Sequence, residues 1–178
     1  ITKAVKEEIS VTTGIHAHND IGCAEADCFA AVKSGATHIQ GTFIGFGERC
    51  GNANLSSVMA TLKLKMGYEL SPVIDLTRLT KTARHIAEIS NITLTDNLAY
   101  IGKNAFSHKG GMHIDGVAKN TISFEHISPE LVGNKRNLLI SEMGGRSVIL
   151  SKIKQIAPEL EKDSVEVQSI LELLKKME

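Results

Sequence analysis

The apolar residues in the first third of the chain follow two alternating periods. Apolar, β-branched runs at residues 9–15 and 37–43 predict two strands. A helical period follows each run, so the predicted strands are separated by roughly 25 to 30 residues that include a helix. This spacing is typical of a parallel sheet. The pattern therefore predicts an α/β fold that begins with two βα units.

Capping residues mark the ends of these helices. Asn19 or Asp20 is expected to cap the first helix, which Gly35 ends. The second helix is expected at residues 55–66. The chain opens at Ile1, with no initiating Met, inside a further amphipathic segment. This opening predicts that the sequence is a piece of a longer protein.

Beyond Gly67 the pattern becomes mostly helical. The expected elements are a helix capped by Asp75, an irregular stretch at 97–111, a short helix at 115–119, a helix from about Arg146 to the residue before Pro158, and a final helix capped by Asp163. The change in pattern predicts two domains, with residues 1–66 forming the α/β part and residues 67–178 the helical part.

Composition and charge exclude several classes of protein. The 20 basic and 20 acidic residues balance, and no basic cluster is dense enough for nucleic acid binding. No apolar run reaches the length of a membrane span, and no signal peptide is recognisable. The three cysteines (Cys23, Cys28 and Cys50) lack the spacing of a metal site and indicate a reducing compartment. A cytoplasmic protein is expected.

Two histidines close the first predicted strand. His16 and His18 lie two residues apart, so on a strand both imidazoles point to one side, about 7 Å apart along the strand. That arrangement suits two ligands of one metal ion. A surface histidine pair that binds nothing explains the same pattern, and the two residues alone do not decide between these interpretations.

A glycine-rich segment follows the second predicted strand. Gly45, Gly47 and Gly51 allow tight turns and close approach of the backbone to a ligand, although an ordinary strand-to-helix loop would use glycines in the same way. Taken alone, Glu48 and Arg49 are expected to form a solvated pair. Reactive groups of parallel sheets lie just beyond the carboxyl ends of strands. Because both polar segments lie there, we expect them to form one site.

A third polar segment lies at residues 104–116. It contains two histidines, a lysine and paired glycines ahead of a predicted helix. Such a group of side chains is suited to anion binding or proton transfer. A capped helix with exposed polar residues explains the segment equally well.

The three segments together resemble one family, the 2-isopropylmalate, homocitrate and citramalate synthases. The resemblance rests on His16-Ala17-His18-Asn19-Asp20, on Gly45-Phe46-Gly47-Glu48-Arg49 followed by Gly51-Asn52, and on Gly111-Met112-His113-Ile114-Asp115-Gly116. It implies an acetyl-CoA-dependent enzyme built on a metal-binding TIM barrel and a helical linker region. This chain would span the last βα units of the barrel and the helical linker subdomains.

The resemblance also implies a role for each matching residue. The metal ligands would be His16, His18 and Asn52, the catalytic residues His113 and Glu48, and the cofactor-binding residues Gly45, Gly47 and Arg49. The family works as a homodimer in which the histidine matching His113 reaches the active site of the partner subunit. Phe124 stands where many relatives carry a tyrosine, and its ring cannot donate a hydrogen bond.

The implied cofactor is a divalent metal (Mn, Mg or Zn), and the implied co-substrates are acetyl-CoA and a small 2-oxo acid. The family's Arg-Asp signature from the first barrel strand is not found at the start of this chain. The segments at 106–113, 123–134 and 141–147 favour the citramalate branch, with pyruvate as the 2-oxo acid, over 2-isopropylmalate or homocitrate synthase.

Two other classes of function stay open at this point. Metal-dependent amidohydrolases also carry His-x-His on a barrel strand, but they need further histidine and aspartate ligands on later strands, and no matching ligands follow here. A non-enzymatic chain would act only as a linker and dimerisation module. Release of CoA from acetyl-CoA separates an enzyme from such a module.

Overall fold

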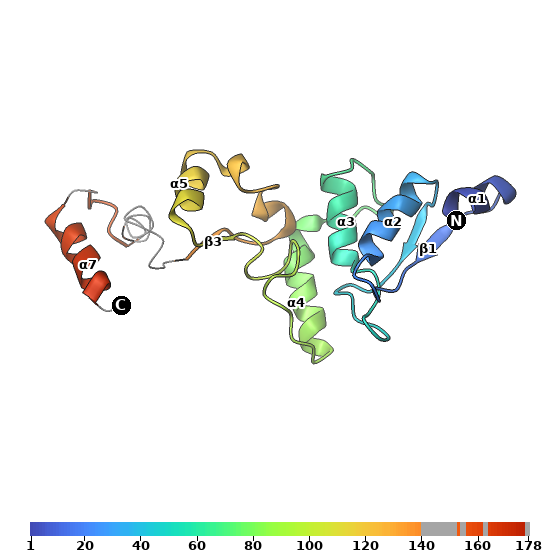
Figure 1. The fold of residues 1–178 in the computed structure, drawn as a ribbon, viewed down its shortest axis with the longest axis horizontal. Helices are drawn as coiled ribbons and strands as arrows, with labels where there is room; N and C mark the ends of the chain where they lie inside the picture. Colours follow the sequence, from blue (N-terminus) through green and yellow to red (C-terminus); the bar gives the residue numbers. More distant parts are fainter. Residues whose placement is uncertain (140–152, 154–155, 162–163, 177–178) are drawn as a thin grey trace. The chain divides into compact units, whose positions relative to one another are not determined.

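The structure is a computed structural model that describes residues 1–139, 153, 156–161 and 164–176. It divides into two compact units. Unit 1 comprises Ile1–Ala105 with Glu130–Asn134, and unit 2 comprises Phe106–Pro129 with Lys135–Glu178. Figure 1 shows the helices and strands of each unit. The domain boundary predicted at residue 66 lies inside unit 1 and stays a prediction.

Unit 1 contains the predicted parallel strand pair. Strands β1 (Gly14–His16) and β2 (His38–Gln40) pair in parallel, with Ile15 opposite Ile39. Both strands are shorter than the apolar runs that predicted them. Two isolated β-bridges lie beyond the ends of these strands in the described part of the chain. One joins His18 to Asn52 and the other joins Thr42 to Asn54.

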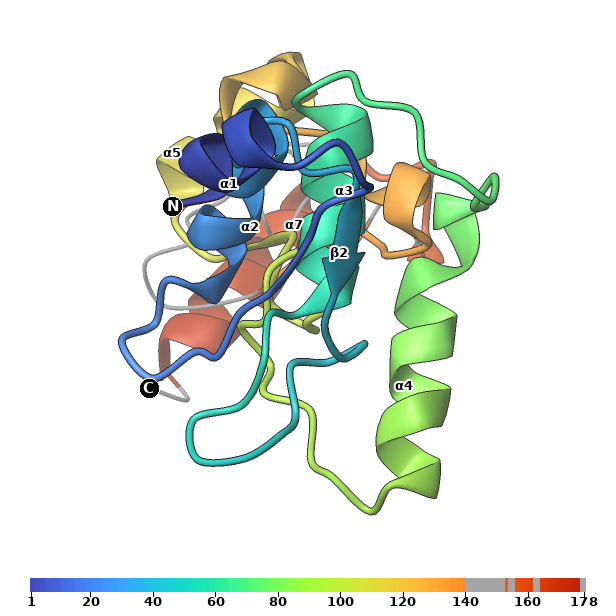
Figure 2. The same ribbon diagram turned by 90° about the vertical axis from the view of Figure 1, so that its right-hand side faces the viewer.

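Helices α2 (Ala24–Lys33) and α3 (Leu55–Leu64) pack beside this strand pair, as Figure 1 and Figure 2 both show. They enclose a core of small and medium-sized apolar side chains: Ala17, Ala24, Cys28, Ala53, Val58 and Leu62. Burial is the main reason that the pKa of Cys28 rises to about 11, so its thiol stays neutral among these residues. A helix α1 (Thr2–Glu8) precedes β1, as the amphipathic opening predicts.

Capping chemistry explains where the helices of unit 1 begin. Asn54 caps α3 by accepting a hydrogen bond from the backbone N–H of Ser56. Asp75 caps the turn that leads through Leu76–Arg78 into α4 (Leu79–Ile89), as predicted. The expected cap at Asn19 or Asp20 is wrong, because the N-cap residue of α2 is Cys23. Asn19 acts from outside the helix, since its Oδ1 accepts from the backbone N–H of Ala24 at 3.2 Å.

The segment Glu130–Asn134 completes unit 1. The Nδ2 of Asn134 donates to the carbonyl oxygens of Tyr100 and Gly102 at 2.9 and 3.0 Å. The hydroxyl of Thr80, on α4, donates to the carbonyl of Val132 at 2.7 Å. These buried hydrogen bonds tie the segment to α4 and to the irregular stretch before residue 105.

Unit 2 contains a strand pair that the sequence pattern does not predict. Strands β3 (Ser107–His108) and β4 (Asn137–Leu138) pair in parallel, and helix α5 (Gly111–Lys119) follows β3. The short turn at Thr121–Ser123 comes next along the chain. Helix α5 begins four residues before the predicted start at residue 115, because Gly111 and Met112 already lie within it.

The last helix of unit 2 is α7 (Val165–Lys176). Its Val167 is fully buried and packs against Ile153 and Leu160. The Oγ of Ser164 accepts from the backbone N–H of Val167 at 3.3 Å. Of the helix predicted from Arg146 to the residue before Pro158, only residues 153, 156 and 157 are described, and residues 153 and 156 are helical. The start of that helix and the cap predicted at Asp163 lie outside the described residues. No helix among the described residues is long and apolar enough to cross a membrane.

Candidate metal centre and a second histidine cluster

The end of β1 presents two histidines on one side of the chain. Ala17 is buried in the core of unit 1, whereas His16 and His18 on either side of it are exposed. Their ring centroids lie 5.1 Å apart, with the ring planes at 81° to each other. The strand alternation predicted from the sequence is confirmed, and the two imidazoles are near enough to contact one ion.

Asn52 lies beside these histidines through an antiparallel bridge to His18. Backbone hydrogen bonds hold this arrangement, from Asn19 N–H to the carbonyl of Gly51 at 2.8 Å and from Ala53 N–H to that of Ala17 at 3.0 Å. The Nδ2 of Asn52 donates to the carbonyl of Phe46 at 3.4 Å.

The side-chain oxygen of Asn52 is buried and has no hydrogen-bond partner among the described residues. A buried carbonyl oxygen without a donor costs free energy, and a cation can compensate for that cost. The side-chain oxygen of Asn52, together with His16 and His18, forms a set of two imidazole nitrogens and one amide oxygen, and such a set suits a divalent metal. In the described part of the chain, no group of three or more His, Cys, Asp or Glu residues could hold a metal by itself. The residues present therefore fit a metal ion as a partial ligand set.

The glycine-rich segment shapes the loop that carries Asn52. Gly45 and Gly51 have φ angles of 80° and 91°, in the left-handed region that favours glycine. A Cβ on Gly47 would meet the amide of Asn52, and one on Gly51 would overlap the carbonyl oxygen of Gly45. The glycines therefore let the loop fold tightly around the side chain of Asn52.

Arg49 joins this loop to the segment that follows β1. Its Nε and Nη2 donate to the two carboxylate oxygens of Asp20 at 2.9 and 2.8 Å. The hydrogen bond from Arg49 is the largest cause of a lowered pKa of Asp20. The two side chains are 55% and 46% exposed, so the pair fixes geometry more than it adds stability. Arg49 therefore pairs with Asp20, and both Glu48 and Arg49 are exposed, as expected from the sequence for a solvated pair.

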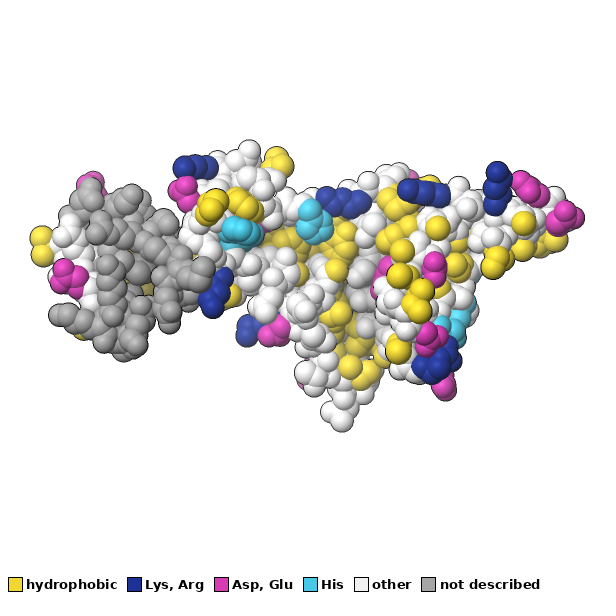
Figure 3. Space-filling view, viewed as in Figure 1, with side chains coloured by type: hydrophobic (Ala, Val, Ile, Leu, Met, Phe, Trp, Pro, Cys, Tyr) yellow, Lys and Arg dark blue, Asp and Glu magenta, His cyan; other side chains and the backbone are white. Residues whose placement is uncertain are grey.

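Figure 3 shows histidine side chains at the surface of both units, beside charged side chains in unit 1 and bordered by hydrophobic ones in unit 2. In unit 2, His113 is exposed on α5 and its ring stacks on Phe124, with centroids 4.2 Å apart and planes at 25°. The ring of His108 lies 6.5 Å from that of His113.

The structure brings together His16, His18 and Asn52, with Glu48, Arg49, Gly45 and Gly47 on the same loop of unit 1. His113 belongs to unit 2. The sequence pattern gives Asp20 no role in the site. Its partner Arg49 lies 29 positions away in the sequence, and local patterns carry no signal for such a pair.

Comparison with known proteins matches nearly the whole chain to two family models. Residues 1–86 match the HMGL-like model, and residues 100–178 match the model described as homocitrate synthase post-HMGL domain-like. The (R)-citramalate synthases of Aquifex aeolicus and Geobacter sulfurreducens are 45% and 41% identical to this chain over its whole length. The 2-isopropylmalate synthase of Oceanobacillus iheyensis is 38% identical over 93% of the chain.

The chain spans about a third of the length of these relatives, namely 34% of the two citramalate synthases and 32% of the 2-isopropylmalate synthase. The two matches follow one another along the chain, and only residues 87–99 between them are unmatched. The chain therefore belongs to the HMGL-like synthase family that includes the citramalate and 2-isopropylmalate synthases.

Proposed function

We propose that this chain is part of an acyltransferase that condenses acetyl-CoA with a 2-oxo acid, and that the acid is pyruvate, giving citramalate. The observation that carries the proposal is the buried oxygen of Asn52, unpartnered among the described residues, next to His16 and His18. Family membership supports the reaction class. The longer protein that would carry this chain is called the full-length synthase.

The proposed architecture places residues 1–66 in the last βα units of a TIM barrel and residues 67–178 in helical linker subdomains. Parallel pairing of β1 with β2, with α2 and α3 beside them, supports the barrel assignment. In such a barrel the site lies at the carboxyl ends of the strands, which is where His16 and the loop after β2 are found.

In this proposal His16, His18 and Asn52 hold a divalent cation (Mn, Mg or Zn), together with ligands from outside this chain. The bound cation supplies a Lewis acid for the keto group of the 2-oxo acid. The Arg49–Asp20 pair and the loop glycines keep Asn52 aligned with the two imidazoles. Gly45, Gly47 and Arg49 border the space where the substrates would bind, and exposed Glu48 is available for proton transfer.

His113 is the proposed base for acetyl-CoA. Its exposed imidazole takes a proton from the acetyl methyl group onto a ring nitrogen, which leaves the methylene carbon able to attack the keto carbon. The stacked ring of Phe124 holds the imidazole but has no hydroxyl to donate. We propose a homodimer in which His113 of one copy serves the metal centre of the other, as the family resemblance implies.

The proposal is tested by the substrate preference of the full-length synthase. With acetyl-CoA and a divalent metal, we expect CoA release to be faster with pyruvate than with 2-oxoisovalerate, the 2-oxo acid of the isopropylmalate branch. A preference for 2-oxoisovalerate would contradict the pyruvate assignment and support the second candidate function, that of a 2-isopropylmalate synthase, which the similarity to such synthases favours.

We also expect no CoA release from the isolated chain, because its metal ligand set is partial. CoA release by the isolated chain would contradict the claim that this chain carries only part of the metal ligand set.

A further inference from the structure

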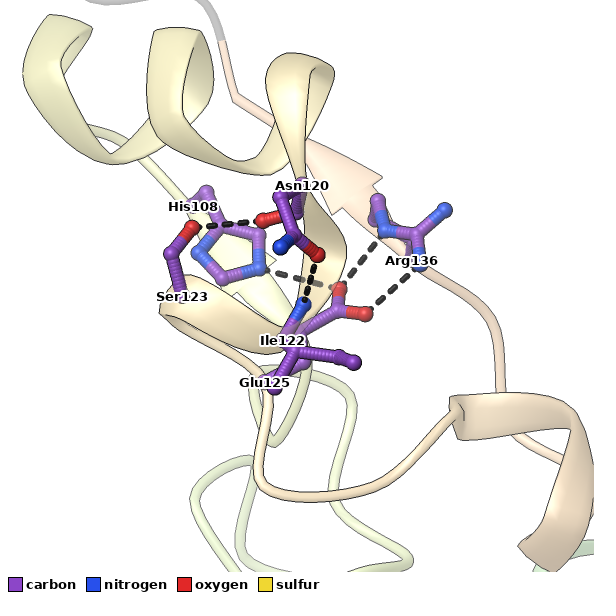
Figure 4. Close-up of polar contacts among 6 residues, drawn as sticks. All are labelled: His108, Asn120, Ile122, Ser123, Glu125 and Arg136. Carbon is purple, nitrogen blue, oxygen red and sulfur yellow. Dashed lines mark hydrogen bonds and ion pairs between the residues drawn. The ribbon is translucent and has the colours of Figure 1, made fainter.

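A buried set of charged and polar side chains in unit 2 has no part in the function proposed above. Arg136 donates two hydrogen bonds to the carboxylate of Glu125, from Nε to Oε1 and from Nη2 to Oε2, both 2.6 Å long. The Oε1 of Glu125 also lies 3.1 Å from Nε2 of His108. Figure 4 shows the side chain of Glu125 between those of His108 and Arg136. The side chains of His108 and Glu125 are only 8% and 2% exposed. Burial of a carboxylate and an imidazole costs free energy unless both are paired. The hydrogen bonds to Glu125 compensate for that cost and keep its carboxylate in one position.

The carboxylate of Glu125 sets the tautomer of His108. The hydrogen bond from Arg136 is the largest cause that holds the pKa of Glu125 below its ordinary value, against the opposite effect of burial. Glu125 is therefore ionised at neutral pH and can only accept hydrogen bonds. The hydrogen of a neutral His108 consequently lies on Nε2, and Nδ1 is the nitrogen away from the carboxylate.

Glu125 is connected to His113 by two routes. The preceding residue, Phe124, stacks its ring on His113 at 4.2 Å, and the ring of Phe124 lies so near α5 at Gly116 that a Cβ there would overlap it. On the second route, the ring of His108 lies 6.5 Å from that of His113. The carboxylate of Glu125 therefore contacts one of the two rings that border His113, and the other ring belongs to the residue next to Glu125 in the chain.

We propose that Arg136, Glu125 and His108 are positioning residues for His113. In this arrangement the carboxylate of Glu125 maintains one tautomer of His108 and one place for the ring of Phe124, so that His113 keeps a single orientation toward acetyl-CoA. The inference rests on the proposed function, in which His113 takes the proton. A displacement of about 1 Å at a reacting group can lower a rate about 100-fold, which is why such support affects turnover more than binding.

Steady-state kinetics of the full-length synthase with Glu125→Gln tests this proposal. Glutamine keeps the size of the side chain, removes its charge and permits either tautomer of His108. We expect kcat to fall between about tenfold and 100-fold, with KM for the 2-oxo acid unchanged. Glu125→Asp is expected to recover part of the loss because it restores the charge. The control is Lys119→Gln, which removes the ion pair with Asp115 on α5 and is expected to leave kcat unchanged.

Circular dichroism identifies the folded variants, and kcat is expressed per folded protein. A folded Glu125→Gln variant with wild-type kcat overturns the positioning role. If that variant does not fold, His108→Gln, which keeps the Arg136–Glu125 pair, is measured in the same way, and an unchanged kcat is again the overturning result. Wild-type turnover in His113→Ala overturns the proposed function itself. An inactive His113→Ala with wild-type kcat in Glu125→Gln overturns the positioning role alone.

Discussion

Replacing His18 by alanine in the full-length synthase is expected to lower turnover more than about 100-fold and to weaken metal binding. The side chain lies 5.1 Å from His16, centroid to centroid, and is bridged through the backbone to Asn52. Its loss leaves one imidazole and one amide oxygen in this chain, and a neutral amide is a weak ligand by itself. We expect His16→Ala to have the same effect. Metal content by elemental analysis and CoA release with pyruvate are the measurements.

The matched control is His38→Ala. His38 is also an exposed histidine of the β1–β2 pair, but it stands at the start of β2, opposite Gly14, and not at the carboxyl end of the strands. We expect its substitution to leave metal content and turnover near the wild-type values. Wild-type metal affinity and turnover in His18→Ala would show that the metal assignment is wrong.

Replacing Gly51 by alanine is expected to lower the free energy of unfolding of the chain by about 3 kcal/mol or more. Gly51 has a φ of 91°, which L-residues other than glycine rarely adopt, and a Cβ there would overlap the carbonyl oxygen of Gly45. The loop must therefore open, and Asn52 moves with it. Urea denaturation followed by circular dichroism measures the change.

Gly22→Ala separates the two causes of this loss. Gly22 also has a left-handed φ, of 74°, but a Cβ added there meets no heavy atom within 4 Å in the described structure. In Gly22→Ala only the backbone strain remains, and we expect it to lower the free energy of unfolding by about 1 kcal/mol. Equal effects of the two substitutions would contradict the close packing of the loop around Asn52.

Local sequence patterns predicted the parts of the fold that depend on neighbouring residues. The apolar runs located β1 and β2, and the side chain of Asp75 caps its helix as expected. The pairing of β3 with β4 was missed because a strand of two residues has no period to detect. Helix α5 starts earlier than predicted because the paired glycines, expected to lie ahead of the helix, belong to its first turn: Gly110 is its N-cap and Gly111 its first residue.

In the candidate site, too, the sequence predicts what neighbouring residues determine and misses what only the fold brings together. Strand alternation was sufficient to place His16 and His18 on one side of the chain. The pairing of Arg49 with Asp20 joins residues 29 positions apart, and that of Arg136 with Glu125 joins residues 11 apart. Neither pair has a helical or strand period between its members, so only the folded chain reveals them. The unpartnered oxygen of Asn52 is likewise a property of packing.

The central claim is that the metal residues and His113 serve one reaction, from two copies of the protein. Its most direct test mixes full-length His16→Ala with full-length His113→Ala under conditions where subunits exchange, with hybrids verified by native mass spectrometry. Each variant alone is expected to be inactive. A hybrid dimer contains one site with both groups intact, so CoA release should return to about a quarter of the wild-type rate in an equal, randomly exchanged mixture. Hybrids that form without any recovered activity would contradict the account.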